Sequence, residues 1–135
     1  MRGRESRRLA MILDTNAVSA FFEGVPEVCR RAGASDALAI PSIVLGEYRF
    51  GISGSRLRVE LDAKLGRLER LAQVLVVDET TARHYASIRR ELKDAGRPIP
   101  ENDLWIAALA RQHARPLLSD DSHFDLVSGI ERIGW

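Results

Sequence analysis

The sequence has 135 residues, of which 45% are hydrophobic and 29% are charged, and its formal net charge at pH 7 is +1. This length suits one domain with a continuous core, and the composition excludes an intrinsically disordered chain. The overall charge points to no class of partner. A single cysteine, Cys29, excludes an intramolecular disulfide and a cysteine-based zinc site, and it suits a reducing cytosol.

The first ten residues carry arginines at positions 2, 4, 7 and 8, ahead of the apolar run LAMIL at 9–13. Asp14 ends this run, which is too short for a signal peptide or a membrane span. We therefore expect a cytoplasmic protein without a membrane segment. Residues 1–10 would be a flexible basic arm or an over-long start, and residues 11–135 the folded domain.

Short apolar runs alternate with longer segments of helical periodicity along the chain. The apolar runs predict strands at 9–13, 37–40, 74–77 and 116–119, and a terminal edge strand at 130–135. The segments between them predict helices near 15–23, 27–33, 42–52, 56–72, 79–94 and 102–113. Buried strands separated by helices indicate an α/β fold with a mainly parallel sheet of about five short strands. Ligands of such sheets bind beyond the carboxyl ends of the strands.

Acidic residues follow three of the predicted strands. Asp14 follows the first strand, and Asp120 and Asp121 follow the fourth. Each has a structural alternative, because aspartate is common as a helix N-cap and in turns. Asp78 also ends a strand, but the helical segment directly after it makes a helix cap the simplest interpretation.

Glu47 lies in the helical segment SIVLGEYRFGI, which is apolar nearly all round and should be largely buried. Phe50 is among its expected core-facing neighbours. A buried carboxylate is costly unless a positive charge compensates it. The structural alternatives to a functional role are an ion pair with a partner such as Arg49 or Arg111, or a side chain that reaches solvent.

Asp103 lies at the start of the apolar helical segment ENDLWIAALARQH. The helix macrodipole alone could explain an acid in this first turn. However, Ile106, Ala107 and Ala110 share its helix face and place Asp103 on the side that packs inward.

Clustered carboxylates need a cation if they are to stay ionised close together. The sheet could bring four acidic positions to one rim, namely Asp14, Glu47, Asp103 and the Asp120–Asp121 pair. Oxygen ligands alone suit Mg²⁺ or Mn²⁺ rather than Zn²⁺, and Mg²⁺ is often shared with substrate phosphates. The pattern therefore predicts phosphodiester or phosphoryl chemistry.

Two other enzyme classes with acids at strand ends fit less well. A phosphoacceptor switch domain would need a lysine near the end of the last strand, whereas Lys64 and Lys93 lie in predicted helices. A phosphatase of the haloacid dehalogenase type would need an aspartate where this chain has Asn16. The histidines lack metal-ligand spacing and are interpreted as helix-surface or turn residues: His84, His113 and His123.

The acids lie in order within MILDTNAVSAFFEG, IPSIVLGEYRFGI and GRPIPENDLWIAALARQHARPLLSDDSHFD. With these segments the chain resembles, from Met11 to Trp135, the PIN-domain ribonucleases, in particular the VapC-type toxins of type II toxin–antitoxin systems. The resemblance implies a three-layer α/β/α fold with a central parallel sheet. It also implies a quartet of acids around Mg²⁺ or Mn²⁺.

Carried over to this sequence, the resemblance implies catalytic roles for Asp14, Glu47, Asp103 and a fourth acid within SDDSHF. The position of Phe124 favours Asp121 as the fourth acid. Asp14, Asp103 and Asp121 would hold the metal, and Glu47 would act through a water molecule.

Three supporting residues follow from the same resemblance. Asn16 and Ser119 match polar positions that orient the carboxylates or a water, although a helix cap and a turn former are equally ordinary interpretations. Asp120 would assist the site, cap the turn or have no role.

The implied function is an endoribonuclease that cleaves RNA phosphodiester bonds, with tRNA or rRNA as candidate substrates. The resemblance further implies a toxin neutralised by a small antitoxin of VapB type, a homodimer, and contact with operator DNA only through the antitoxin complex. The alternative is a non-catalytic PIN-fold protein that serves as a module for binding an antitoxin or another partner.

Overall fold

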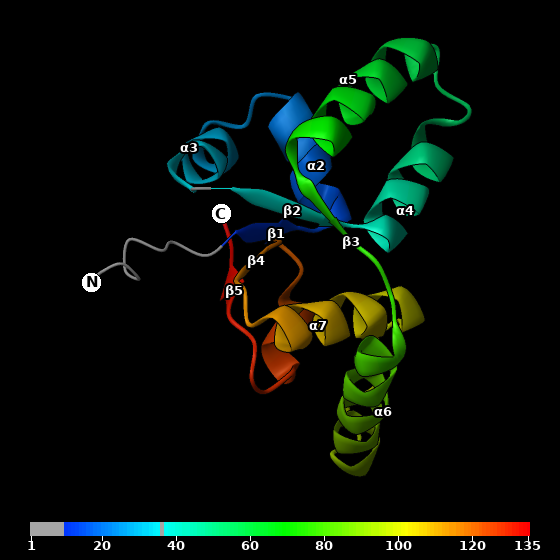
Figure 1. The fold of residues 1–135 in the computed structure, drawn as a ribbon, viewed down its shortest axis with the longest axis vertical. Helices are drawn as coiled ribbons and strands as arrows, with labels where there is room; N and C mark the ends of the chain where they lie inside the picture. The colour runs from blue at the N-terminus through cyan, green and yellow to red at the C-terminus, as the bar shows by residue number, and fades with distance from the viewer. Residues whose placement is uncertain (1–9, 36) are drawn as a thin grey trace.

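The computed structural model describes residues 10–35 and 37–135, and it contains a five-stranded parallel sheet (Figure 1). The strands lie in the order β3-β2-β1-β4-β5. Their bounds are β1 (Met11–Leu13), β2 (Leu38–Pro41), β3 (Gln73–Leu75), β4 (Leu117–Leu118) and β5 (Arg132–Ile133). The arm expected at residues 1–10 lies almost entirely outside the described residues.

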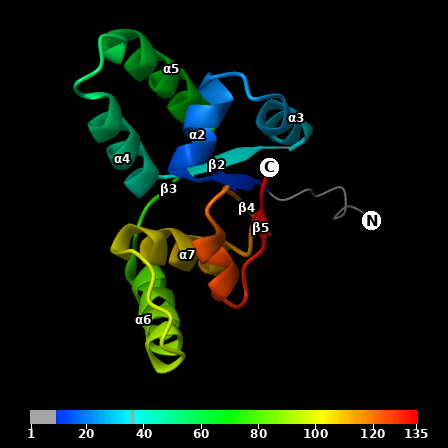
Figure 2. The same cartoon turned by 180° about the vertical axis from the view of Figure 1, so that it is seen from behind.

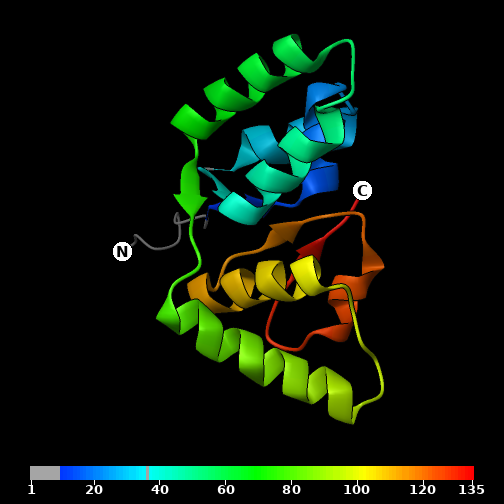
Figure 3. The ribbon, with the colours of Figure 1, turned by 90° about the vertical axis from the view of Figure 1, so that its right-hand side faces the viewer.

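Helices cover both faces of this sheet. Four of them lie on one side, namely α2 (Thr15–Phe22), α3 (Pro26–Ala34), α4 (Ser42–Ile52) and α5 (Arg58–Leu71). On the other side are α6 (Glu79–Asp94), α7 (Glu101–His113) and the short 3-10 helix η1 (Ser122–Leu126). Figure 3 shows the two groups of helices separated by the strands, which confirms the predicted three-layer α/β/α arrangement. None of the helices in the described residues combines the length and apolar character that crossing a membrane requires.

The centre of the sheet is fully buried, as the apolar runs predict. β1 and β4 are adjacent and parallel, with Ile12 opposite Leu117 and Leu13 opposite Leu118. All four of these side chains are inaccessible to solvent. These apolar strands form a rigid base for whatever side chains follow their carboxyl ends.

The two edge strands of the sheet, β3 and β5, are shorter than the sequence predicts. The strand expected at 74–77 ends at Leu75, and Val76 and Val77 are 59% and 42% exposed. The terminal strand expected at 130–135 is confirmed at the edge of the sheet, but only Arg132–Ile133 pairs with β4. Apolar composition marks a strand, whereas its length depends on how many residues find a backbone partner.

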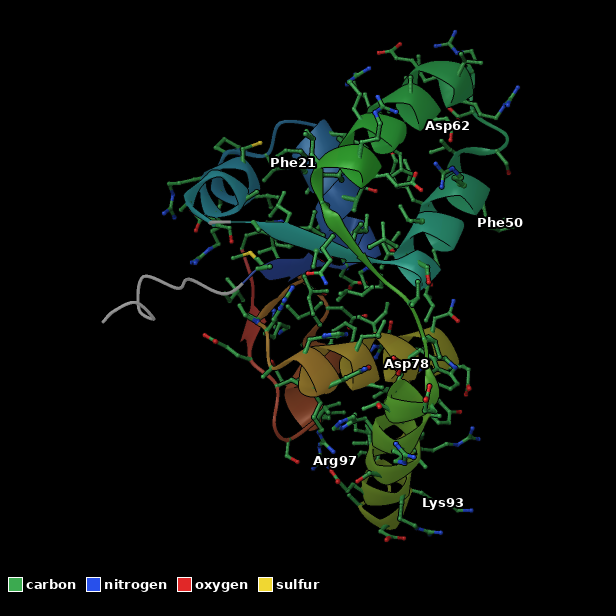
Figure 4. All side chains as sticks on the ribbon, viewed as in Figure 1. Phe21, Phe50, Asp62, Asp78, Lys93 and Arg97 are labelled. Carbon is green, nitrogen blue, oxygen red and sulfur yellow. The ribbon has the colours of Figure 1, made fainter. Side chains whose placement is uncertain are left out.

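The expectation that α4 is buried nearly all round is wrong. Val44, Leu45 and Tyr48 are buried, but Phe50 is 82% exposed and lies on the outer side of the helix (Figure 4). α4 covers the sheet with one face only, so its apolar residues on the opposite face point to solvent.

The strand order reverses between β1 and β4. The chain builds outward from β1 to β2 and β3, and then places β4 and β5 on the other side of β1. Figure 2 shows the paired strands β1 and β4 between α2 on one side and α7 on the other. This reversal is the position at which open α/β sheets bind their ligands.

Two phenylalanines offer a test of the core. Phe124 in η1 is 1% exposed, so Phe124→Ala should lower the free energy of unfolding by about 3 to 5 kcal/mol. The same substitution at the exposed Phe50 should change it by less than about 0.5 kcal/mol. Urea unfolding followed by circular dichroism measures both. Equal losses in the two variants would contradict the assignment of Phe124 to the core.

Candidate active site

Asp14 lies at the carboxyl end of β1 and is also the N-cap of α2. Its Oδ1 accepts the Thr15 backbone N–H at 2.8 Å, while Oδ2 accepts the Ser119 hydroxyl at 2.7 Å and the Asn16 amide at 3.3 Å. Only 4% of the residue is exposed. This burial raises the pKa of Asp14 against the opposing effect of the Ser119 and Thr15 hydrogen bonds. Asp14 therefore caps the helix and also lies beyond the carboxyl end of a strand, where open α/β sheets commonly bind their ligands.

The hydroxyl of Ser119 connects the ends of β1 and β4. Ser119 is fully buried, donates to Asp14 and accepts the backbone N–H of Asp121 at 3.0 Å. The pKa of Asp14, raised mainly by burial, is raised further by the nearby charge of Asp121. Asp120 is exposed instead, and its backbone N–H donates to the Asn16 amide oxygen at 3.3 Å. The structure thus places Asp121, and not the side chain of Asp120, beside Asp14.

Asp103 reaches the same place from the first turn of α7. Its side chain is 14% exposed. Burial, followed by the charges of Asp14, Asp121 and Glu47, raises the pKa of Asp103 to about 6. The inward face predicted from the apolar residues of α7 therefore points at the other acids.

Glu47 comes from α4 and is held through both of its carboxylate oxygens. Oε1 accepts the Thr15 hydroxyl at 2.6 Å, and Oε2 accepts the Asn102 amide at 2.8 Å. These two contacts join α4 to the start of α2 and to the start of α7. Both contacts are made by neutral groups, and Glu47 is half-buried and therefore partly reaches solvent.

The ion pair considered for Glu47 is not formed. Arg49 contacts Asp62 and Glu69, each at 2.9 Å, on α5. Arg111, in the last turn of α7, pairs with Glu91 of α6 at 3.1 Å. Both arginines therefore pair with carboxylates other than that of Glu47.

Three residues of the site were missed by the sequence interpretation: Thr15, Asn102 and His123. Thr15 and Asn102 lie next to acids within the motifs DTN and ND, and this adjacency is the signal that could have identified them. The imidazole Nδ1 of His123 lies 3.0 Å from Asp121 Oδ1 and 3.6 Å from Asp103 Oδ2. The interpretation of His123 as a plain turn residue is therefore incomplete.

Comparison with known proteins identifies the family. The model of the PIN domain family matches residues 11–130. Ribonuclease VapC5 of Mycobacterium tuberculosis is 33% identical over 126 residues, which cover 92% of this chain and 92% of that protein. This chain is a PIN-domain member of the VapC ribonuclease family.

Two solved structures have folds similar to that of this chain. The crystal structure of VapBC-5 from Mycobacterium tuberculosis, of the VapBC family of toxin–antitoxin systems, has a TM-score of 0.74 at 32% identity and covers 93% of this chain and 98% of that chain. DNA-bound VapBC from Salmonella typhimurium has a TM-score of 0.84 at 27% identity, with 94% and 98% covered. The fold of this VapC-family chain is thus the fold of these toxin–antitoxin proteins.

The acids of this VapC-family protein fit a divalent metal ion. Within residues 10–35 and 37–135, no arginine or lysine forms a salt bridge with Asp14, Glu47, Asp103 or Asp121. Asp103, Asp121 and His123 offer donor atoms that all lie within 4.8 Å of one another. Carboxylate oxygens are the ligands that Mg²⁺ and Mn²⁺ prefer.

Repulsion among these acids predicts that Asp103→Asn stabilises the metal-free protein. Because folding raises the pKa of Asp103 from 3.8 to about 6, ionising this carboxyl lowers the stability of the folded state progressively as the pH rises through that range. In EDTA the variant should melt a few degrees higher than the parent at pH 8, since about 1 kcal/mol shifts the Tm of such a domain by roughly 4 °C. The difference should vanish near pH 4. Thermal melts across this pH range measure it.

Asp78→Asn is the matched control. Hydrogen bonds from Thr81 hold the pKa of Asp78, the N-cap of α6, below its usual value, so the charged form is the stabilising one there. This control should melt lower than the parent at pH 8. A lower Tm for Asp103→Asn at pH 8 in EDTA would instead mean that Asp103 is a structural residue of α7.

Proposed function

We propose that this protein is a Mg²⁺- or Mn²⁺-dependent endoribonuclease that hydrolyses RNA phosphodiester bonds with the acids Asp14, Glu47, Asp103 and Asp121. The observation that carries the proposal is the gathering of these carboxylates at the reversal of strand order, with burial and mutual repulsion raising the pKa of Asp103 to about 6. Pure protein binding would give no reason to accumulate such repulsion. A divalent cation and a phosphate substrate would relieve it.

Asp14, Asp103 and Asp121 would hold the ion. A divalent ion bound there makes water more acidic and stabilises the negative charge that develops on the phosphate oxygens. Ser119 and Asn16 fix the orientation of the Asp14 carboxylate, and Ser119 also fixes the backbone of Asp121. These contacts would keep the ligands in place before substrate arrives.

Glu47 would accept the proton of the attacking water. Thr15 and Asn102 hold its two oxygens in a fixed direction, and each carboxylate oxygen has a further lone pair free to receive a proton. Attack by this water would break the bond between phosphorus and the leaving RNA oxygen, which would take a proton from solvent. The nucleophile in this scheme is water, so neither a side-chain nucleophile nor the RNA 2′-hydroxyl is required.

RNA is the proposed substrate because the curated relatives of this chain are named ribonucleases. Within RNA, tRNA and rRNA are the candidate targets. Arginine side chains around the rim would hold the substrate backbone electrostatically, as 18 of the 20 basic residues are arginine.

We propose further that the protein is the toxin of a pair and that a small VapB-type antitoxin neutralises it in the cytoplasm. The support is the similarity to VapBC proteins, one of which was solved bound to DNA. By the same similarity, this protein would form a homodimer and would reach operator DNA only as part of the antitoxin complex.

The decisive experiment maps the 5′ ends of total cellular RNA after incubation with the purified, antitoxin-free protein. New ends should appear with Mg²⁺ or Mn²⁺ and disappear with EDTA. They should also be absent with Asp103→Asn and present with Asp78→Asn, which removes an aspartate charge away from the site. Total RNA is needed because such an enzyme can cut a single structured target.

The position of the new ends names the substrate directly. If a protein preparation that binds Mn²⁺ produces no new ends, the partner-binding alternative gains and the nuclease proposal fails. New ends that persist in EDTA or with Asp103→Asn would point to a contaminating nuclease.

Glu47→Gln separates proton transfer from metal binding. Because the amide cannot accept the proton, the cleavage rate should fall by about 10²-fold or more. The affinity for Mn²⁺, measured by titration calorimetry, should fall much less than it does in Asp103→Asn. Equal losses of Mn²⁺ affinity in the two variants would make Glu47 a metal ligand instead.

A further inference from the structure

His123 lies beside the acids because the turn after β4 holds it there. Its backbone N–H donates to Asp121 Oδ1 at 2.9 Å, and this bond closes the turn at the start of η1. The next residue, Phe124, is buried in the core and anchors the same turn. The imidazole, whose side chain is 50% exposed, is thereby directed to the side on which Asp121 and Asp103 present their oxygens.

The two distances from the imidazole nitrogen lie within the range expected between neighbouring and opposite ligands of one metal ion. When an octahedral ion has ligands at about 2.1 Å, neighbouring donor atoms lie roughly 3.0 Å apart and opposite ones roughly 4.2 Å. Nδ1 of His123 lies 3.0 Å from Asp121 Oδ1 and 3.6 Å from Asp103 Oδ2. The three residues offer donor atoms within 4.8 Å of one another. They come from two separate elements, α7 and η1, and converge on one point.

A simple hydrogen bond from His123 to Asp121 explains only part of this geometry. It accounts for the 3.0 Å contact, although Asp121 Oδ1 already accepts a backbone N–H. The 3.6 Å separation from Asp103 is too long for a hydrogen bond. Both separations fit ion pairs if the imidazole is protonated, and they fit equally a common metal ion held by Asp103, Asp121 and His123.

We propose that Nδ1 of His123 is a direct ligand of the divalent ion in the candidate active site. The inference rests on the proposed function, because it concerns the same metal site. The donor set would then contain an imidazole nitrogen as well as carboxylate oxygens. Imidazole favours transition metals, whereas carboxylates alone suit Mg²⁺, so His123 would shift the site toward Mn²⁺ and Zn²⁺ relative to Mg²⁺.

The test compares the full-length protein with three variants by titration calorimetry with Mg²⁺, Mn²⁺ and Zn²⁺. His123→Ala removes the ligand, and His123→Asn keeps a hydrogen-bond donor near the position of Nδ1. His84→Ala removes a histidine of α6 as the matched control. Both His123 variants should lose at least about tenfold in Zn²⁺ affinity, keep most of their Mg²⁺ affinity and retain the parent Tm in EDTA. The control should bind all three ions as the parent does.

A direct readout comes from the imidazole nitrogens in ¹⁵N-labelled protein. Adding Zn²⁺, which is diamagnetic, should shift the Nδ1 resonance of one histidine, and that resonance should be missing in His123→Asn. An unshifted Nδ1, or a His123→Asn variant with the metal preference of the parent, would overturn the inference and leave the proposed function standing, provided that Mg²⁺ binds and Asp103→Asn abolishes its binding. If the parent protein binds no divalent ion, both proposals fall.

Discussion

The burial of a negative charge at the end of β1 is the constraint on which the site depends. Asp14 is 4% exposed and is surrounded by neutral hydrogen-bond donors. Such donors orient a carboxylate without cancelling its charge, so the electrostatic cost of burial remains in the folded protein. Asp103 bears the same cost, and its pKa of about 6 reflects first burial and then the three neighbouring carboxylates. Burial and mutual repulsion therefore raise the pKa values of both Asp14 and Asp103, as expected where a cation would be favourable.

Sheet topology explains how so short a chain can assemble this cluster. Because β1 and β4 are neighbours, Asp14 and the Ser119–Asp121 segment leave the sheet side by side, although they are about a hundred residues apart in sequence. α4 and α7 start on opposite faces of the sheet and bring Glu47 and Asp103 to the same rim. The hydrogen bond between Glu47 and Asn102 then spans the two layers directly. The buried apolar strands keep the backbone of the sheet rigid, and the hydrogen bonds between elements align the carboxylates.

The sequence predicted the parts of this arrangement that follow from local pattern. The confirmed features are the three-layer fold, the five short strands and the helices, most of which agree within two residues at each end. Asp14 could be placed at a strand end and Asp103 on an inward helix face, because periodicity fixes both. Phe50 was misplaced, since an apolar residue does not reveal which face of α4 meets the sheet.

Contacts between residues far apart in the sequence could not be predicted from such local patterns. The partners of Glu47 lie 32 and 55 residues away, and the Ser119 bond to Asp14 spans 105 residues. The place of His123 in the site was not predicted for the same reason. His123 comes close to Asp103 only when α7 packs beside η1. Motif spacing can identify ligands on one helix or one turn, but it cannot identify ligands that separate elements bring together.

The distribution of arginine supports the view that the site is kept for a cation. Arg49, Arg111 and Arg132 all lie in elements next to the acids, yet each forms its salt bridges with other carboxylates, on α5, on α6 and within η1. A guanidinium that paired with Asp103 or Glu47 would neutralise the carboxylate, but it would also occupy the lone pairs that a metal ion needs. Because these arginines pair elsewhere and the acids contact hydroxyl, amide and imidazole groups, the repulsion among the carboxylates is not relieved by an arginine, and their lone pairs stay available for a ligand.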